Sequence, residues 1–206
     1  MKKNRIIMHT KKEKILKKYH AEDYVKSKVW KFDAQEALPF LPTPFEAIKA
    51  TFNYLESHQE IENIHTMCDL GAGDGRVIIY AAKNYGIDST GLEINTELIN
   101  STKKKIKKLH LSKLCRIFEA DFYNFDISHM NLLIFFSIPT DHPYIHHLIK
   151  NIKSGAIVVS VRWPMDTFSD YWITKIVLHP VLDFNIFIYN YLQTPPNIGQ
   201  HRYNIS

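Results

Sequence analysis

The stretch MCDLGAGDGR at residues 67–76 decides the fold of this chain. Apolar residues lead into it, and from Val77 onward the apolar positions recur at helical spacing. Glycine tolerates a positive φ and lets a ligand approach the backbone where a Cβ would collide. The free N–H groups in the first turn of the following helix also favour a polar ligand. We therefore predict a strand, a ligand-binding turn and a helix, in that order.

The spacing of the glycines separates two kinds of nucleotide-binding loop. The dinucleotide fingerprint is Gly-x-Gly-x-x-Gly. Here Gly71, Gly73 and Gly75 alternate with other residues, and Asp69 stands two positions before the first glycine. A glycine-rich loop alone is weak evidence, so the residues downstream must decide between the two kinds.

Two downstream acids supply that evidence. Glu93 closes the predicted strand STGLE (89–93) and lies 22 residues after Gly71, near the interval at which a βαβ fold places its ribose-binding acid. A carboxylate suits a ribose because it can accept hydrogen bonds from both hydroxyls. Asp121 follows a predicted strand at 114–119. Either acid alone could be a surface residue at a strand end. The glycine-rich loop, Glu93 and Asp121 in this order together predict one nucleotide-type site.

Taken together, these motifs resemble those of class I S-adenosylmethionine-dependent methyltransferases, whose motif I is an acid-led Gly-x-Gly-x-Gly loop. The segment PTPF (42–45) and the loop ending DGR (74–76) narrow the resemblance. They look like the small seven-strand protein-lysine methyltransferases, a group with archaeal broad-specificity enzymes and relatives that act on the mitochondrial ATP synthase c-subunit. The resemblance runs from about Leu38 to Trp163.

The resemblance implies S-adenosyl-L-methionine as the cofactor. Glu93 would then hold the ribose, Asp121 would take the adenine amino group, and Phe122 would pack on the adenine ring. The full set of residues that the resemblance assigns to the cofactor is Thr43, Asp69, Gly71, Ala72, Gly73, Glu93, Ile94, Asp121 and Phe122.

The assignment of catalytic residues is less direct. The segment FFSIPT (135–140) keeps Pro139 but has Ser137 where the family resemblance predicts a larger apolar residue, and SVRWP (160–164) also departs from the pattern. Ser137, Pro139 and Trp163 follow predicted strands, at the edge where open α/β sheets bind ligands. We assign them to the channel for the acceptor lysine, with ordinary packing at the strand ends as the alternative. The Asn/Asp-Pro-Pro-aromatic signature of enzymes that act on exocyclic base amines is absent.

Positive charge is concentrated in two places. The 206-residue chain carries a net charge of +5, and residues 1–28 contain ten Lys or Arg against three acids. A second cluster lies at 103–108. A solvated helix face would explain these lysines, as would attraction to an acidic protein or to nucleic acid. No base-reading motif accompanies them, so we favour a protein substrate. A methyltransferase acting on RNA or a small molecule is the alternative, as is an inactive cofactor-binding partner subunit.

Other features narrow the class of protein further. No apolar run approaches the length of a membrane-spanning helix, and the Lys-rich N-terminus lacks the apolar core of a signal peptide, which predicts a cytoplasmic protein. Cys68 and Cys115 fall in predicted core strands, which favours buried thiols over a disulfide. His142 and His146 could share a helix face, but apart from Asp141 no Cys or acid stands at ligand spacing, so no metal is expected.

The alternation of predicted strands and helices indicates an α/β fold. We predict a doubly wound, mostly parallel seven-stranded sheet of the Rossmann-like methyltransferase type. The two β-rich segments 171–178 and 185–192 should form a C-terminal antiparallel hairpin. Residues 1–43 should form a helical segment with a proline-rich hinge, and 44–206 the methyltransferase domain. Thr43 is predicted to cap a helix whose first residue is Pro44.

Overall fold

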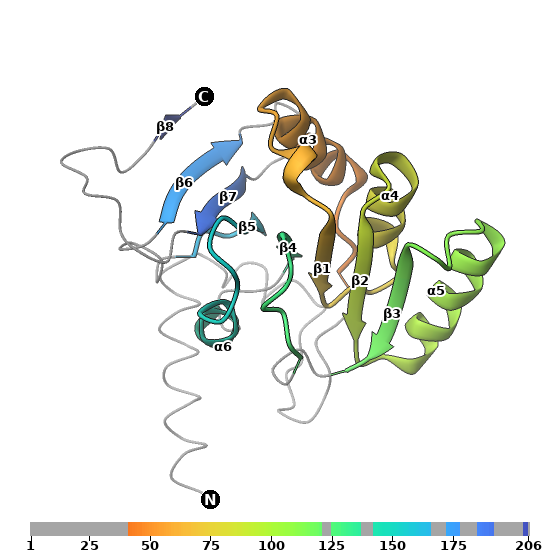
Figure 1. Cartoon of the computed structure of the whole chain (residues 1–206). Helices are drawn as coiled ribbons and strands as arrows, with labels where there is room; N and C mark the ends of the chain where they lie inside the picture. Colours follow the sequence, from red (N-terminus) through yellow and green to blue (C-terminus); the bar gives the residue numbers. More distant parts are fainter. Residues whose placement is uncertain are drawn as a thin grey trace, which may run out of the picture.

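The computed structural model describes residues 41–120, 125–136, 142–165, 172–177, 185–191 and 204–205. The helices in these segments are α3 (Phe45–Ser57), α4 (Arg76–Tyr85), α5 (Thr96–Lys108) and α6 (His142–Ile149), with a 3₁₀ turn at Ile61–Asn63. The strands are β1 (Thr66–Leu70), β2 (Asp88–Glu93), β3 (Cys115–Glu119), β4 (Leu132–Phe135), β5 (Ile157–Arg162), β6 (Trp172–Val177), β7 (Asn185–Tyr191) and β8 (Asn204–Ile205). Figure 1 shows their arrangement.

All these strands belong to one sheet with the order β3-β2-β1-β4-β5-β7-β6-β8. Strands β1 to β5 run parallel, whereas β7 pairs antiparallel with both β5 and β6. Strands β2 and β3 are added on one side of β1, and β4 and β5 are added on its other side, as in doubly wound sheets. The predicted α/β fold with a C-terminal antiparallel hairpin is confirmed.

The two faces of the sheet are covered by different helices. Successive strand residues point to opposite faces, so Met67 packs with α3, α4 and α5, whereas Cys68 packs with α6. Both predicted core cysteines are buried and free, and burial raises the pKa of each thiol. Cys68 and Cys115 belong to the clusters on opposite faces, which separates them.

The amino ends of the central strands are held together by one amide side chain. Asn131 Oδ1 accepts hydrogen bonds from the backbone N–H of His65 (3.2 Å) and from the N–H and hydroxyl of Thr66 (3.1 and 2.9 Å). The N–H of Asn131 donates to the carbonyl of Thr66 at 3.0 Å. Further along this edge, Arg116 pairs with Asp88. These contacts join β1 to β4 and β2 to β3.

Two details differ from the sequence prediction. The described sheet has an eighth strand, the two-residue β8, beside β6. Thr43 does not cap α3: the helix begins at Phe45 after an extended Pro44, with no side-chain cap. The Thr43 carbonyl accepts a hydrogen bond from Arg76 Nη1 at 3.2 Å. The predicted N-terminal helical segment lies outside the described residues as far as residue 40.

Candidate functional site

The predicted ligand-binding turn lies at the carboxyl end of β1. Gly71, Gly73 and Gly75 all have positive φ, at 76°, 54° and 75°. The N–H groups of Gly71 and Ala72 donate to the Leu92 carbonyl at 2.9 and 2.8 Å, which anchors the turn to the end of β2. A Cβ built on Gly71 would meet nothing within 4 Å, so the space above this residue is open.

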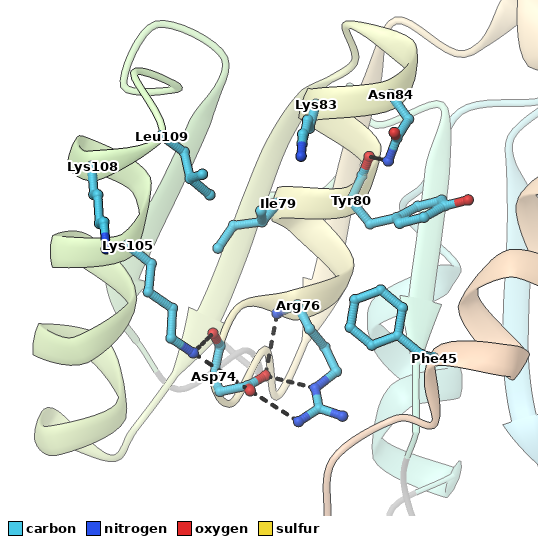
Figure 2. Close-up of a pocket in the computed structure, with 10 residues that line it drawn as sticks. All are labelled: Phe45, Asp74, Arg76, Ile79, Tyr80, Lys83, Asn84, Lys105, Lys108 and Leu109. Atoms are coloured by element: carbon cyan, nitrogen blue, oxygen red, sulfur yellow. Dashed lines mark hydrogen bonds and ion pairs between the residues drawn. The ribbon is translucent and has the colours of Figure 1, made fainter.

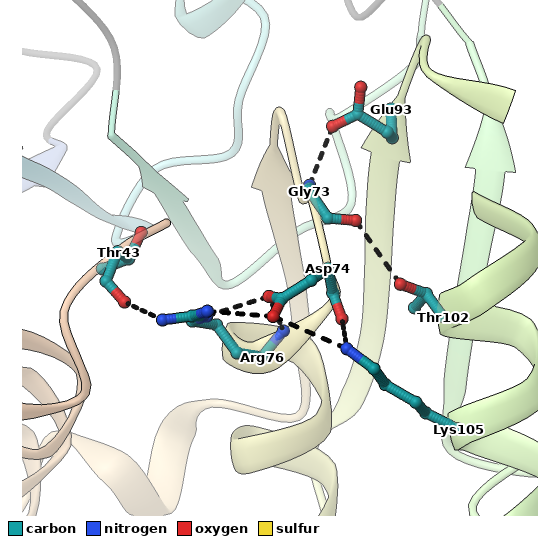
Figure 3. A network of polar contacts seen from close by, with 7 residues as sticks. All are labelled: Thr43, Gly73, Asp74, Arg76, Glu93, Thr102 and Lys105. Atoms are coloured by element: carbon teal, nitrogen blue, oxygen red, sulfur yellow. Dashed lines mark hydrogen bonds and ion pairs between the residues drawn. The ribbon is translucent and has the colours of Figure 1, made fainter. Parts of the chain in front are cut away.

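Glu93 stands at the end of β2, against the turn. Its Oε2 accepts a hydrogen bond from Gly73 N–H at 2.8 Å (Figure 3), and Oε1 accepts from the N–H groups of Ile94 and Asn95 at 2.9 Å each. Each carboxylate oxygen has two lone pairs, and three of the four are used by these bonds, so Oε2 can still accept from one ribose hydroxyl. Ile94 beside it is 55% exposed, an apolar surface at the same edge.

Asp69 introduces a buried carboxyl group directly before the turn. It is 4% exposed, and none of the described residues donates a hydrogen bond to its carboxylate. Burial, with the nearby charges of Glu93 and then Asp74, raises the pKa of Asp69 to about 8. A buried acid to which no described residue donates, next to an open glycine turn, fits a positively charged polar ligand such as the predicted cofactor.

Charged side chains hold the outer side of the turn in place (Figure 3). Asp74 accepts from Arg76 Nε and Nη2 at 2.9 Å each, and Lys105 Nζ donates to the Asp74 carbonyl at 3.0 Å. Arg76 Nη1 also donates to the Thr43 carbonyl at 3.2 Å. Partial burial would raise the pKa of Asp74, but Arg76 and Lys105 hold it below its ordinary value. Arg76 thereby links the segment before α3 to the glycine turn.

Close packing fixes the turn against the helices. A Cβ on Gly75 would lie 2.3 Å from Thr102 Cγ2, and one on Gly91 would lie 2.7 Å from the Ala72 side chain. Thr102 is fully buried and donates its hydroxyl to the Gly73 carbonyl at 3.4 Å. The alternating glycines therefore serve the approach of α5 as well as the ligand.

Trp163 follows β5 at the same edge of the sheet. Its side chain is 6% exposed, and its ring stacks on Phe136 with centroids 5.9 Å apart. The Arg162 guanidinium lies 5.1 Å from the Trp163 ring, and Arg162 itself has a φ of 79°. A non-glycine residue held in this conformation stores strain, which is concentrated at functional sites.

The structure gathers most of the predicted cofactor residues at the carboxyl edge of β1 and β2. These are Thr43, Asp69, Gly71, Ala72, Gly73, Glu93 and Ile94. Asp121, Phe122, Ser137 and Pro139 lie outside the described residues. Sequence reasoning missed Thr102 and the role of Arg76, and it placed Lys105 only in the basic cluster at 103–108. For Arg76, the one signal in the sequence was the Asp-Gly-Arg ending of the loop.

Within the described segments, no three His, Cys, Asp or Glu side chains gather where they could hold a metal ion. No described helix combines the length and apolar character that crossing a membrane requires.

Comparisons with known proteins agree with this geometry. The family model of the ANTKMT methyltransferase domain matches residues 69–171. A protein-lysine N-methyltransferase of Saccharolobus islandicus (strain REY15A) is 30% identical over 125 residues, which are 60% of this chain and 75% of that protein. A lysine N-methyltransferase of the ATP synthase c-subunit, from Xenopus laevis, is 25% identical over 62% of this chain, and the match spans 54% of that protein.

A solved structure shares the fold. The RNA methyltransferase from Salinibacter ruber, in complex with S-adenosyl-L-homocysteine, superposes with a TM-score of 0.65 at 22% identity. The superposition covers 78% of this chain and all (100%) of that one. At this identity the likeness concerns the fold alone.

Proposed function

Because this chain belongs to the ANTKMT methyltransferase domain family, we propose that it methylates lysine side-chain amines of a protein. It is an S-adenosylmethionine-dependent methyltransferase. The observation that carries the proposal is the pairing of the glycine turn and Glu93, joined at 2.8 Å, with relatives that are named for lysine methylation.

The residues at the carboxyl edge suit the binding of this cofactor. When bound, S-adenosylmethionine supplies a methyl group on a positively charged sulfur. We propose that Glu93 holds its ribose and that the open space over Gly71 takes its methionine end. Asp69, buried and without a donor among the described residues, offers a negative charge near that end once it is ionised.

The acceptor amine must be neutral to attack the methyl carbon. A lysine amine is mostly protonated at neutral pH because its ordinary pKa is about 10.4. Desolvation lowers the pKa of such an amine. We propose that the buried Trp163 ring, with Phe136 stacked on it and with Ser137 and Pro139, forms a dry channel that does this. The proton then leaves to water, and positioning supplies much of the rate.

The hinge before α3 belongs to the same proposal. Arg76 connects the Thr43 carbonyl to Asp74 in the glycine turn. We propose that residues 1–43 cover the mouth of the site through this connection. Deleting residues 1–30 should leave the domain folded and weaken cofactor or substrate binding, and a truncated protein with full activity would refute this part of the proposal.

The test uses S-adenosylmethionine labelled in its methyl group, a cell lysate and the full chain. The label should enter protease-sensitive material and be recovered as methyl-lysine after hydrolysis. Nuclease-sensitive label would replace the proposal with RNA methylation. Cofactor binding without incorporation would indicate an inactive partner subunit.

Two variants test the assignment of the cofactor site. Glu93→Ala should weaken cofactor binding by about 1.5–3 kcal/mol, since hydrogen bonds to a charged group are lost. Gly73→Val should place a branched side chain in the cofactor volume. Glu97→Ala, an exposed acid in the first turn of α5, is the matched control and should bind normally. Unchanged calorimetric affinity in both site variants would overturn the assignment.

A further inference from the structure

A groove opens between α4 and α5, on the outer side of the glycine turn (Figure 2). Its volume is about 600 Å³, within the range of sites that hold drug-sized ligands. Asp74 and Arg76 line one end of the groove, and Lys83 lines it from the last turn of α4. The groove therefore begins behind the glycine turn and leads away from it along α4 and α5.

Cations dominate the polar lining of this groove. The charged residues that line it are four cations and one carboxylate: Arg76, Lys83, Lys105 and Lys108 with Asp74. That carboxylate is already engaged by Arg76 at 2.9 Å and lies 3.5 Å from Lys105 Nζ. Among the described residues, Lys83 and Lys108 form no ion pair or side-chain hydrogen bond. With four cations and one carboxylate among its lining residues, the groove carries a net positive charge.

Apart from Asn84, the remaining lining is mainly apolar. Ile79 and Tyr80 on α4 contribute to it, with Leu109 after α5 and Phe45 at the start of α3. Phe45 is 47% exposed and Leu109 is 42% exposed, so the groove holds two of the four large apolar side chains that the described residues expose. Exposed apolar surface bordered by polar groups is typical of a protein interaction site.

We propose that this groove docks an acidic segment of the protein substrate, in which carboxylates flank an apolar side chain. Lys83 and Lys108 would pair with the carboxylates, and the surface of Ile79, Phe45 and Leu109 would take the apolar side chain. The acceptor lysine would lie elsewhere on the same substrate. This inference rests on the proposed function, because it takes the occupant to be part of the protein that is methylated.

Charge favours this occupant over two others. The N-terminal segment 1–28 carries ten Lys or Arg against three acids, so the groove would repel it. Nucleic acid would also be attracted by the lysines, but the groove's one arginine, Arg76, is engaged by Asp74, so it is not free to stack on a base or grip a phosphate.

The test measures binding of labelled short peptides to the full chain by fluorescence anisotropy. The main probe alternates Glu with Phe and Leu. One control peptide has Lys in place of Glu, a second has Gly in place of Phe and Leu, and a single-stranded RNA of equal charge is the third probe. The Glu, Phe and Leu peptide should bind most tightly, and both changes in the peptide should weaken binding.

Charge reversal then locates the site. The double variant Lys83→Glu with Lys108→Glu should weaken binding of the main peptide at least about tenfold, the size expected from losing two contact ion pairs of about 0.7 kcal/mol or more each. The control is Lys104→Glu with Lys107→Glu, which changes the net charge equally at exposed positions of α5 that do not line the groove. The control should lose no more than about twofold, through the long-range field alone. Cofactor affinity checks that each variant is folded.

Three results would overturn the inference. They are equal losses in the two double variants, tighter binding of the RNA than of the peptide, and no binding of the peptide to the unaltered protein. The assay needs no methyl transfer, so its outcome is separate from that of the proposed function. Lysine methylation with an unchanged KM in the Lys83→Glu, Lys108→Glu variant would refute the docking groove alone.

Discussion

The two ends of the parallel strands are built differently. At the amino end, Asn131 uses its side-chain oxygen to accept three hydrogen bonds from His65 and Thr66. At the carboxyl end, Asp69 is buried without a donor from the described residues, and Arg162 is held at a φ of 79°. The hydrogen bonds of Asn131 stabilise the amino end of the sheet. The strained backbone at Arg162 and the buried acid Asp69 beside the glycine turn mark the carboxyl end as the edge that binds a ligand.

The largest effect should come from the glycine turn itself. Gly75→Ala combines a positive φ of 75° with a Cβ only 2.3 Å from Thr102 Cγ2, and Thr102 is buried and branched. Strain and overpacking should together lower the free energy of unfolding by about 3 kcal/mol. Urea denaturation would measure this loss.

The matched control for the turn is Gly86→Ala. Gly86 has a similar φ of 67°, but nothing lies within 4 Å of its Cβ position. Only the cost of the backbone conformation remains, about 1 kcal/mol. Equal losses in the two variants would show that the contact between α5 and the turn contributes little.

Asp69→Asn should stabilise the unliganded protein while weakening cofactor binding. The folded-state pKa of Asp69 is about 8, above the ordinary value of 3.8. As pH rises from about 4 to 8, the unfolded chain releases this proton while the folded protein keeps it, so the unaltered protein loses stability relative to the variant. Each unit of pKa shift corresponds to about 1.4 kcal/mol. We expect a gain on the order of 2 kcal/mol at pH 8 after relaxation of the interior, and almost none at pH 4.

The readout for Asp69→Asn is denaturation at several pH values, together with calorimetry of cofactor binding. A gain in stability that does not change with pH would contradict the raised pKa. A variant that binds the cofactor as well as the unaltered protein would remove Asp69 from the cofactor site.

Asn131→Ala should show the opposite pattern at the amino edge. The N–H groups of His65 and Thr66 lose their acceptor, which should cost about 1–2 kcal/mol of stability. Cofactor affinity should not change, since these contacts lie at the other end of β1. Denaturation and calorimetry on the same sample would measure both, and a loss of affinity would show that the two edges are coupled.

The smallest effect should come from the ion pair between Arg116 and Asp88. Both side chains are substantially exposed, at 44% and 39%. Exposed pairs contribute about 0–1 kcal/mol, and salt screens them. Arg116→Ala should therefore lower Tm only slightly, and the difference should shrink at high salt. A loss that persists at high salt would show that Arg116 packs as well as pairs.

Several features of the fold could be predicted from short stretches of sequence. The predicted strand at 89–93 lies within β2 (Asp88–Glu93), and the helical pattern seen from Val77 onward belongs to α4 (Arg76–Tyr85). The hairpin followed from two β-rich segments joined by too few residues for a crossover helix. Such features depend on local periodicity, on the positions of glycine and on the length of the connecting segments, all of which can be read from the sequence.

The sequence by itself also determined the positions of the glycine turn and Glu93, because backbone conformation at glycine and strand length are local properties. Only the tertiary structure decided how Arg76 is used: its guanidinium bridges Asp74 and the Thr43 carbonyl. It also decided that Lys83 and Lys108 share one groove while Lys104 and Lys107 do not. These relations depend on how α3, α4 and α5 pack on one face of the sheet, which no local pattern specifies.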